Sequence, residues 1–275
     1  MQRWIAGGRS RHANSGCSVR RMLDSTRAQT FGQVAEEYDK WRPGYPDSAV
    51  DWLAPTAPAR VADLGAGTGK LTSLLLARGL TVEAVEPDAR MLDVLSRNNP
   101  DARCHQAEAS SLPFEDGSLD AVLVADAWHW FDNEATITEL RRVLKPGASL
   151  GVVWNVVAEP VEPWEFELVN DSATYNSATK GSADGVRQRL SYFQDEELEL
   201  AQFAWEWKLS PEHHAAHEAT TSMSIAMTPD ERERHLDTTR SDLQRVCDAA
   251  GRQAMPIRYE ASCARWTPGG RSMHG

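Results

Sequence analysis

A glycine-rich segment near residue 65 has the residue types that hold a small ligand against the backbone. The segment reads Asp63-Leu64-Gly65-Ala66-Gly67-Thr68-Gly69, and Glu86 follows 21 residues after Gly65. Glycines carry no Cβ, so a ligand can approach the main chain closely. Asp63 would orient the ligand through loop amides or water, and Glu86 would accept hydrogen bonds from both hydroxyls of a ribose. The pattern predicts a site for a nucleoside-bearing cofactor.

Two other ligands compete for such a loop. A phosphate-binding loop needs Gly, four residues and then Gly-Lys-Ser/Thr, but Leu64 stands five residues before Gly69 and Leu71 follows Lys70. That interpretation fails. A dinucleotide fingerprint needs GxGxxG, and here the third glycine comes one residue early, with Lys70 in its place. A nicotinamide-dependent oxidoreductase is therefore disfavoured but stays open, and the loop better suits a cofactor without a pyrophosphate.

A polar and aromatic segment follows a long apolar run at residues 119–125. Asp126, Trp128, His129 and Trp130 emerge there. The unperturbed pKa of a histidine is near neutrality, so His129 could remove a proton from a hydroxyl group of a substrate. Alternatively, His129 hydrogen-bonds the cofactor or braces the loop. The tryptophan rings would stack on the cofactor, wall the substrate or pack in the core.

Three more residues with binding chemistry precede the glycine loop, namely Tyr38, Arg42 and Tyr45. Arg42 could clamp a carboxylate of the substrate or cofactor with two hydrogen bonds. A solvated surface arginine is an equally good alternative.

Two clusters later in the chain have simpler explanations than a ligand site. His213, His214 and His217 invite a metal hypothesis, but only His213 and His217 share a helix face and no HExxH motif is present. We therefore expect no metal. Trp205 and Trp207 alternate as strand residues do, which favours core packing.

The hydrophobic pattern predicts the scaffold that positions these residues. Short apolar runs alternate with helical segments up to residue 157, which is typical of a parallel, doubly wound α/β sheet with ligands at the carboxyl ends of its strands. We expect strands at residues 60–64, 82–86, 102–107, 119–125 and 149–156. We expect helices at residues 27–40, 46–53, 68–78, 88–96 and 133–143.

The pattern changes beyond residue 157. Residues 162–178 and 211–250 are predicted to be mainly helical, and residues 201–209 and 257–266 to be strands. Two late strands separated by a helical insertion predict an antiparallel hairpin that finishes the sheet, with the insertion as a lid. The predicted division is a disordered extension at 1–26, a cofactor-binding core with flap helices at 27–157, the helical insertion with the last two strands at 158–266, and a tail at 267–275.

Bulk composition narrows the class of protein. The 275 residues fit one large α/β domain. Five of the 29 basic residues lie in the acid-free residues 1–21, and the net charge is −11, so the body is acidic and no nucleic-acid partner is expected. No stretch approaches the roughly 20 apolar residues of a membrane helix. The four cysteines are scattered without a CxxC pair, which predicts reduced thiols in a cytoplasmic protein.

Four segments together resemble the class I, Rossmann-like methyltransferases. Residues 61–69 resemble the first motif, residues 82–91 the second, residues 107–114 the segment that meets the adenine, and residues 140–147 the motif before the fifth strand. More narrowly, the Arg-Pro-Gly-Tyr-Pro at residues 42–46 and the Trp-His-Trp at residues 128–130 are similar to the small-molecule branch that includes trans-aconitate methyltransferase-like proteins. The resemblance covers residues 27–157 well and residues 160–256 only loosely.

This resemblance implies a seven-stranded sheet, S-adenosylmethionine as cofactor, and methyl transfer to an oxygen, nitrogen or carbon of a small molecule. The implied cofactor site comprises Asp63, Gly65, Ala66, Gly67, Thr68, Gly69, Glu86, Pro87, Met91, Glu108, Ala109 and Asp126. The expected acceptor site comprises Tyr38, Arg42, Tyr45, Trp128 and Trp130, with His129 as a general base or a positioning group. A protein that holds the cofactor without catalysis is the alternative, and neither the acceptor nor the oligomeric state follows from the sequence.

Overall fold

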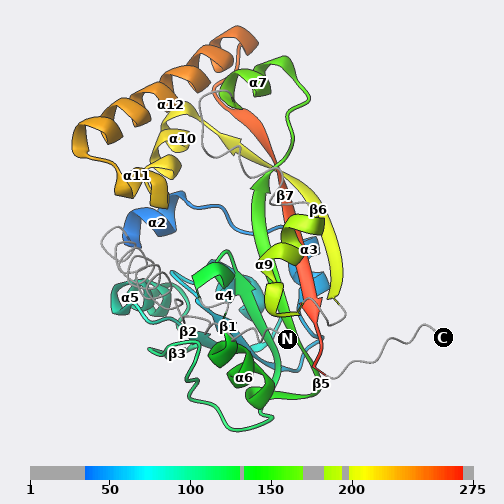
Figure 1. Ribbon diagram of the computed structural model, residues 1–275. Coiled ribbons are helices and arrows are strands. Elements are labelled where there is room, and N and C mark those ends of the chain that lie inside the picture. Colours follow the sequence, from blue (N-terminus) through cyan, green and yellow to red (C-terminus); the bar gives the residue numbers. More distant parts are fainter. Residues whose placement is uncertain (1–34, 131–132, 170–182, 194–197, 269–275) are drawn as a thin grey trace, which may run out of the picture.

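A computed structural model describes residues 35–130, 133–169, 183–193 and 198–268. Within them one seven-stranded sheet has the strand order β3-β2-β1-β4-β5-β7-β6 (Figure 1). The strands are β1 (Arg60–Leu64), β2 (Thr81–Val85), β3 (Arg103–His105), β4 (Leu119–Ala125), β5 (Leu144–Val157), β6 (Leu198–Leu209) and β7 (Met255–Trp266). The predicted α/β class, with a mostly parallel seven-stranded sheet, is confirmed.

Strands β1 to β5 run parallel to one another. β1 and β4 begin and end at the predicted residues. Ala62 and Leu64 of β1 face one apolar cluster, whereas Val61 faces another. Successive strand residues point to opposite faces, so a strand covered on both faces needs a continuous apolar run. The carboxyl ends of β1, β2 and β4 therefore meet at one edge of the sheet.

β5 starts earlier than the predicted residue 149. The strand already includes Leu144 and runs through Lys145-Pro146-Gly147. Leu144 pairs with Leu119, and the next pair joins Ser149 to Ala121, so the pairing shifts register between them. Leu144 is buried in the core, which holds it in the sheet although proline and glycine interrupt the ladder behind it.

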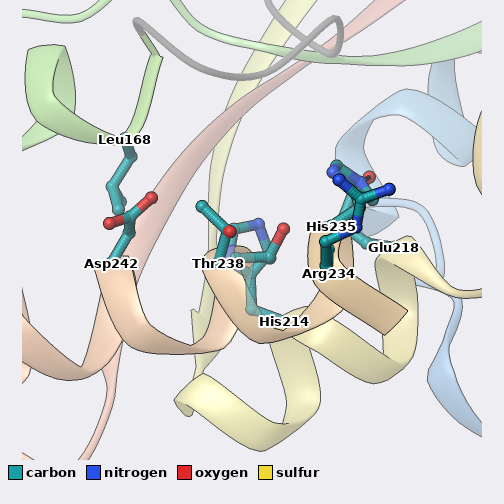
Figure 2. Close-up of a pocket in the computed structure, with 8 residues that line it drawn as sticks. Leu168, His214, Glu218, Arg234, His235, Thr238 and Asp242 are labelled. Atoms are coloured by element: carbon teal, nitrogen blue, oxygen red, sulfur yellow. Dashed lines mark ion pairs between the residues drawn. The ribbon is translucent and has the colours of Figure 1, made fainter. Parts of the chain in front are cut away.

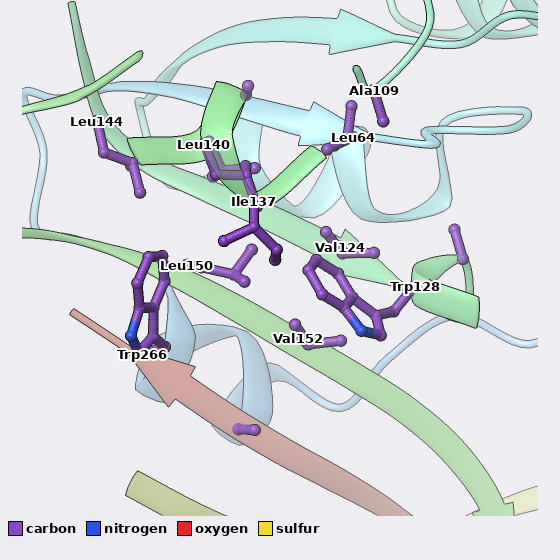
Figure 3. Close-up of a cluster of buried hydrophobic side chains, with 14 of the residues drawn as sticks. Leu64, Ala109, Val124, Trp128, Ile137, Leu140, Leu144, Leu150, Val152 and Trp266 are labelled. Atoms are coloured by element: carbon purple, nitrogen blue, oxygen red, sulfur yellow. The ribbon is translucent and has the colours of Figure 1, made fainter. Parts of the chain in front are cut away.

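Helices cover both faces of the sheet. α3 (Asp47–Leu53) and α4 (Lys70–Leu76) pack on one face. On the other face are α6 (Glu134–Val143) and α9 (Ala183–Arg189). Figure 3 shows Ile137 and Leu140 of α6 beside Leu150 and Val152 of β5. α4 begins two residues later than predicted, because Gly69 adopts a left-handed φ of 92° at its N-cap.

Three further helices complete this part of the fold. α5 (Ala89–Asn98) is capped by the Asp88 side chain, which accepts from the amides of Arg90 and Met91. α2 (Ala35–Trp41) is the described end of the helix predicted at 27–40, whose earlier residues lie outside the described part of the chain. α7 (Pro163–Val169) likewise covers only the start of the helix predicted at 162–178. None of the described helices is both long and apolar enough to span a bilayer.

β7 pairs antiparallel with both β5 and β6, so the predicted hairpin is confirmed. The helical insertion joins β6 to β7 through α10 (Pro211–Glu218), α11 (Ser222–Ala226) and α12 (Pro229–Ala250). Three helices form here because hydroxyl side chains cap each start. Ser210, Thr221 and Thr228 each accept a hydrogen bond from the amide three residues ahead. In Figure 1 these helices lie beyond the ends of β6 and β7, above α2.

Candidate functional site

The glycine loop connects β1 to α4 and is bonded to β2. Gly65, Gly67 and Gly69 have φ values of 69°, 56° and 92°, in the left-handed region that glycine tolerates. The amides of Gly65 and Ala66 both donate to the carbonyl oxygen of Val85, at 2.9 and 3.1 Å. These bonds hold the loop at the carboxyl edge of the sheet.

Gly67 and Gly69 are needed for different reasons. A Cβ on Gly69 would lie 2.4 Å from Asn99 Nδ2 and 2.9 Å from Leu95 Cγ, so this glycine permits close packing of the loop against α5. A Cβ on Gly67 would meet no atom within 4 Å. Gly67 is half-buried and borders open space, so a ligand can approach its Cα closely.

Glu86 lies directly after β2 and contacts the loop. Its Oε2 accepts the amide of Gly67 at 2.9 Å, and its Oε1 accepts the amide of Asp88 at 3.0 Å. The side chain is 9% exposed, and burial raises the pKa of its carboxyl. Each oxygen still has a second lone pair for a ribose hydroxyl.

Asp63 is buried at the end of β1, below the loop. Its Oδ2 accepts the Thr72 hydroxyl of α4 at 2.6 Å. Burial raises the pKa of Asp63 to about 7, although the hydrogen bond from Thr72 lowers it. The charge of the neighbouring Glu86 also raises this pKa. Asp63 Oδ1 and Thr68 Oγ1 are buried without a hydrogen-bond partner among the described residues. Such orphaned polar atoms beside a glycine loop indicate a polar ligand.

Asp126 directly follows β4 and has a left-handed φ of 51°, the one positive φ of a non-glycine residue in the described part of the chain. Its Oδ2 accepts the Tyr45 hydroxyl at 2.9 Å, and its Oδ1 accepts the Asn155 amide at 3.2 Å. Burial raises the pKa of Asp126 to about 6, although the hydrogen bond from Tyr45 lowers it. Burial also raises the pKa of Tyr45. A strained acidic residue at a strand end is typical of a functional site.

α2 and the segment after it form a flap (residues 35–46) that reaches across this edge. Asp39 of α2 lies 3.6 Å from Lys70 Nζ and accepts from Asn98 Nδ2 at 2.9 Å. Arg42 donates through Nε to Thr220 Oγ1 at 3.0 Å and through Nη2 to Thr220 O at 2.9 Å. The flap is thus bonded both to the cofactor loop region and to the helical insertion.

Tyr38 places the flap close to the predicted site. Burial raises its pKa, while Arg42 lowers it and both Asp126 and Glu86 raise it. The Arg42 guanidinium lies 4.9 Å from the centre of the Tyr38 ring. The structure therefore brings the predicted acceptor residues of the flap together with two of the predicted cofactor residues.

The other predicted cofactor residues lie around this centre. Met91 is buried in a small cluster with Ala35 and Val94 that packs α5 on α2. Pro87 and Glu108 are exposed, and Glu108 is close enough to raise the pKa of Glu86. Ala109 is buried in the core cluster of Figure 3.

The Trp-His-Trp segment differs from the expected acceptor wall. Trp128 is fully buried in the core, and its indole Nε1 donates to the Arg189 carbonyl at 3.2 Å. Its side chain has no exposed surface for a substrate. Trp128 was predicted to border the acceptor, and the structure instead places it in the core, as the packing alternative describes. Trp130 is half-buried, and His129 is exposed with its ring centre 4.6 Å from that of Trp130.

The insertion histidines surround a buried carboxylate. Glu218 Oε1 lies 3.6 Å from His217 Nδ1, and Oε2 lies 3.8 Å from His235 Nε2. A hollow of about 300 Å³ between α7, α10 and α12 is lined by Glu218, His214 and His235, among others. Figure 2 shows these three side chains. No group of His, Cys, Asp or Glu in the described chain has the arrangement of a metal site. The hollow is lined by none of the predicted cofactor residues.

Sequence reasoning missed several residues that complete the site. Thr72 bonds Asp63, Asn155 bonds Asp126, and Thr220 anchors Arg42. Tyr259 of β7 is buried in electrostatic range of Arg42 and Asp126. Thr72 lies close to Asp63 in the chain, whereas Asn155, Thr220 and Tyr259 lie far along the chain from their partners, so no local spacing signals these three.

The edge of the sheet thus collects negative charge. Asp63 lies one residue before the end of β1, and Glu86 and Asp126 directly follow β2 and β4. Burial raises the pKa of all three carboxyls. Buried carboxylates favour a cationic ligand and repel a pyrophosphate. S-adenosylmethionine carries a sulfonium and an ammonium group, together with a ribose. The orphaned Asp63 Oδ1, the open space at Gly67 and the Glu86 carboxylate fit that molecule.

Known proteins agree with this assignment. Residues 62–152 match the family model described as "Methyltransferase domain". An uncharacterized methyltransferase of Mycobacterium tuberculosis is 38% identical over 239 residues, which cover 86% of this chain and 95% of the relative. A solved structure from Anaeromyxobacter dehalogenans, assigned as a type II methyltransferase, has the same fold, with a TM-score of 0.60 and 24% identity over 82% of this chain and 96% of its own. The chain belongs to the class I, S-adenosylmethionine-dependent methyltransferases.

Proposed function

We propose that this methyltransferase transfers the methyl group of S-adenosylmethionine to an oxygen, nitrogen or carbon of a small molecule in the cytoplasm. The observation that carries the proposal is the flap: Tyr45 bonds Asp126 while Arg42 bonds Thr220 of the insertion. A reaction centre covered from two sides admits a small molecule more readily than a polymer. The net charge of −11 also disfavours a nucleic-acid acceptor, and the free thiols Cys247 and Cys263 suit a reducing compartment.

The cofactor supplies an already activated methyl group when bound, so the protein mainly aligns the acceptor and excludes water. Gly67, Glu86 and Asp63 would hold the cofactor at the ends of β1 and β2. Tyr38, Arg42 and Tyr45 of the flap would border the acceptor beside Asp126. His129 stays the proposed base or positioning group for a hydroxyl acceptor; a carboxylate acceptor would need no base.

The proposal is tested with methyl-labelled S-adenosylmethionine and a metabolite extract. After incubation, unreacted S-adenosylmethionine is removed, and the small-molecule, protein and nucleic-acid fractions are separated and counted. We expect label in the small-molecule fraction with the wild-type chain and none with the Asp63→Asn variant. Label confined to protein or nucleic acid would refute the small-molecule acceptor.

His129 has a separate test in the same assay. If it takes a proton from the acceptor, His129→Asn lowers kcat by about 10²–10⁴-fold and removes the acidic limb of the pH–rate profile. If it positions the acceptor, KM rises and the shape of the pH profile persists. An unchanged kcat and KM would remove His129 from the site.

A further inference from the structure

Three strands continue beyond the edge where the cofactor residues lie. β5, β6 and β7 have 14, 12 and 12 residues, against five each in β1 and β2. Asp126 donates its amide to Val153 of β5, and Tyr259 pairs with Val157, four residues farther along. Figure 1 shows these strands rising past β1 and β2 towards α10. The part of these strands around Tyr259 therefore lies near Arg42 of the flap.

One face of this extension is aromatic. Trp205 is paired with Tyr259 across β6 and β7, and their ring centres lie 5.2 Å apart. Trp207, two residues on, lies 6.0 Å from Tyr259 and meets His217 edge-on at 5.3 Å. The intervening Glu206 is exposed on the opposite face. The three rings line one face of the two strands: Trp205 packs against the apolar cluster that includes Val153, and Trp207 reaches the insertion.

The polar atoms of these rings need hydrogen-bond acceptors. Trp205 Nε1 is buried and finds no partner among the described residues. The Tyr259 hydroxyl also has no partner among the described residues, but this oxygen keeps contact with solvent. A buried donor left unpaired costs free energy, so such atoms are normally satisfied by water or a ligand.

The charges near Tyr259 are mixed, because the carboxylates of Glu218 and Asp126 and the guanidinium of Arg42 all lie in electrostatic range of it. Arg42, which is in electrostatic range of Tyr259, bonds Thr220 through Nε and Nη2. Its Nη1 makes no hydrogen bond within the described chain. The carboxylate of Asp126 already accepts from Tyr45 and from the Asn155 amide. Trp205 Nε1, the Tyr259 hydroxyl and Arg42 Nη1 are therefore donors without an acceptor among the described residues, whereas the Asp126 carboxylate already accepts two hydrogen bonds.

We infer that Trp205 and Tyr259 select the acceptor, and that it is a planar molecule bearing a carbonyl, carboxylate or enolate oxygen. The indole N–H and the phenol O–H donate to that oxygen, the flat body packs on the two rings, and Arg42 Nη1 adds a preference for negative charge. This inference rests on the proposed function, because the cofactor's position at β1 and β2 places the acceptor here.

The test compares two probes of similar shape and opposite charge, benzoate and benzylammonium. Each is titrated by calorimetry into the wild-type chain saturated with S-adenosylhomocysteine. We expect benzoate to bind and benzylammonium to bind at least about tenfold more weakly. Equal or tighter binding of benzylammonium, or no binding of benzoate, would overturn the inference.

Conservative variants then assign the contacts. Trp205→Phe and Tyr259→Phe keep an aromatic ring and remove one donor each, so each weakens benzoate binding by about tenfold. Trp52→Phe is the matched control, because Trp52 packs in the same apolar cluster under Arg265 and has no proposed role. If the two variants bind benzoate as tightly as Trp52→Phe, the donors are not used and the inference is wrong.

S-adenosylhomocysteine separates this result from the proposed function. All variants are expected to bind it with the wild-type affinity, since the aromatic rings of β6 and β7 lie away from the glycine loop. A wild-type chain that does not bind it would undermine the proposed function itself. Normal binding of S-adenosylhomocysteine without the expected benzoate preference would overturn only the acceptor class.

Discussion

The amide of Gly67 donates to Glu86 Oε2 at 2.9 Å, so the two halves of the cofactor pattern are bonded to each other. The bond joins the loop after β1 to the residue after β2. It fixes the carboxylate beside a glycine whose Cβ position is open space. A change at Gly67 should therefore lower the affinity for the cofactor strongly and the stability of the fold only slightly.

Gly67→Ala should weaken S-adenosylmethionine binding by about tenfold or more while destabilising the fold by only about 1 kcal/mol, the usual cost of a left-handed alanine. Calorimetric titration and thermal unfolding measure the two effects. Gly147→Ala is the matched control, since Gly147 has φ 80° and open space around its Cβ position but lies outside the site. Equal affinities of the two variants would contradict a cofactor at Gly67.

Binding of the cationic cofactor should weaken as the pH falls. Burial raises the pKa of Asp63 to about 7 and that of Asp126 to about 6, so both carboxylates lose their negative charge between pH 8 and pH 5. We expect the Kd for S-adenosylmethionine to rise over this range, with proton release on binding near pH 6–7. S-adenosylhomocysteine lacks the sulfonium charge and should show a smaller change. Identical pH dependences for the two would count against the carboxylates as the charge that attracts the sulfonium.

Asp63→Asn should stabilise the fold at pH 8 while abolishing cofactor binding. The raised pKa means that the folded state binds this proton more tightly than the unfolded state, so ionisation costs stability as the pH rises from about 4 to about 7. Removing the charge should add about 1–3 kcal/mol at pH 8, or about 2–4 °C of Tm per kcal/mol, and less near pH 4.

Asp120 provides the control for that experiment, because its pKa is lowered where that of Asp63 is raised. Lys145 lowers the pKa of Asp120, so its ionised form stabilises the folded state. Asp120→Asn should therefore lower the Tm slightly at pH 8. A Tm decrease of the same sign for Asp63→Asn would show that Asp63 is held as a stabilising anion.

The helical insertion should loosen at alkaline pH. The Glu218 carboxylate raises the pKa of His235 above 6.5, so their ion pair contributes stability below pH 6.5 that is lost as the pH rises through the raised pKa. Hydrogen exchange of α10 and α12 should show about 1 kcal/mol less protection above that pKa. Glu218→Gln should remove this pH dependence, whereas Glu212→Gln, an exposed acid on the same helix, should keep it. A wild-type profile that is flat with pH would disprove the role of the pair.

The strands that hold the cofactor were predictable because each is defined by its own residues. β1 and β4 are covered on both faces, so their apolar runs are continuous and end where polar residues begin. Loop conformation was equally local, since Gly65, Gly67 and Gly69 occupy left-handed positions that glycine tolerates best. The start of β5 was not predictable, because Leu144 joins the strand through pairing with Leu119 across a register shift.

The acceptor side depended on contacts between distant segments. The sequence singled out Trp128 for its position after β4, yet its indole is buried against α9 and η4 (Ser191–Phe193). Trp205 was expected only to pack, and its unpaired N–H became visible once β6 lay beside β7. Arg42 was ambiguous until Thr220, 178 residues away, proved to bind it.

The sequence by itself determined the sheet, the glycine loop and the pairing of that loop with Glu86, because hydrophobic periodicity and glycine geometry are properties of short segments. Only the tertiary structure decided which side chains face the reacting centre. Burial raised the pKa of Asp63 and Asp126, and the extension of β5, β6 and β7 brought Tyr259 towards the flap. Burial and electrostatic neighbourhood arise from the packing of distant segments, which no local pattern encodes.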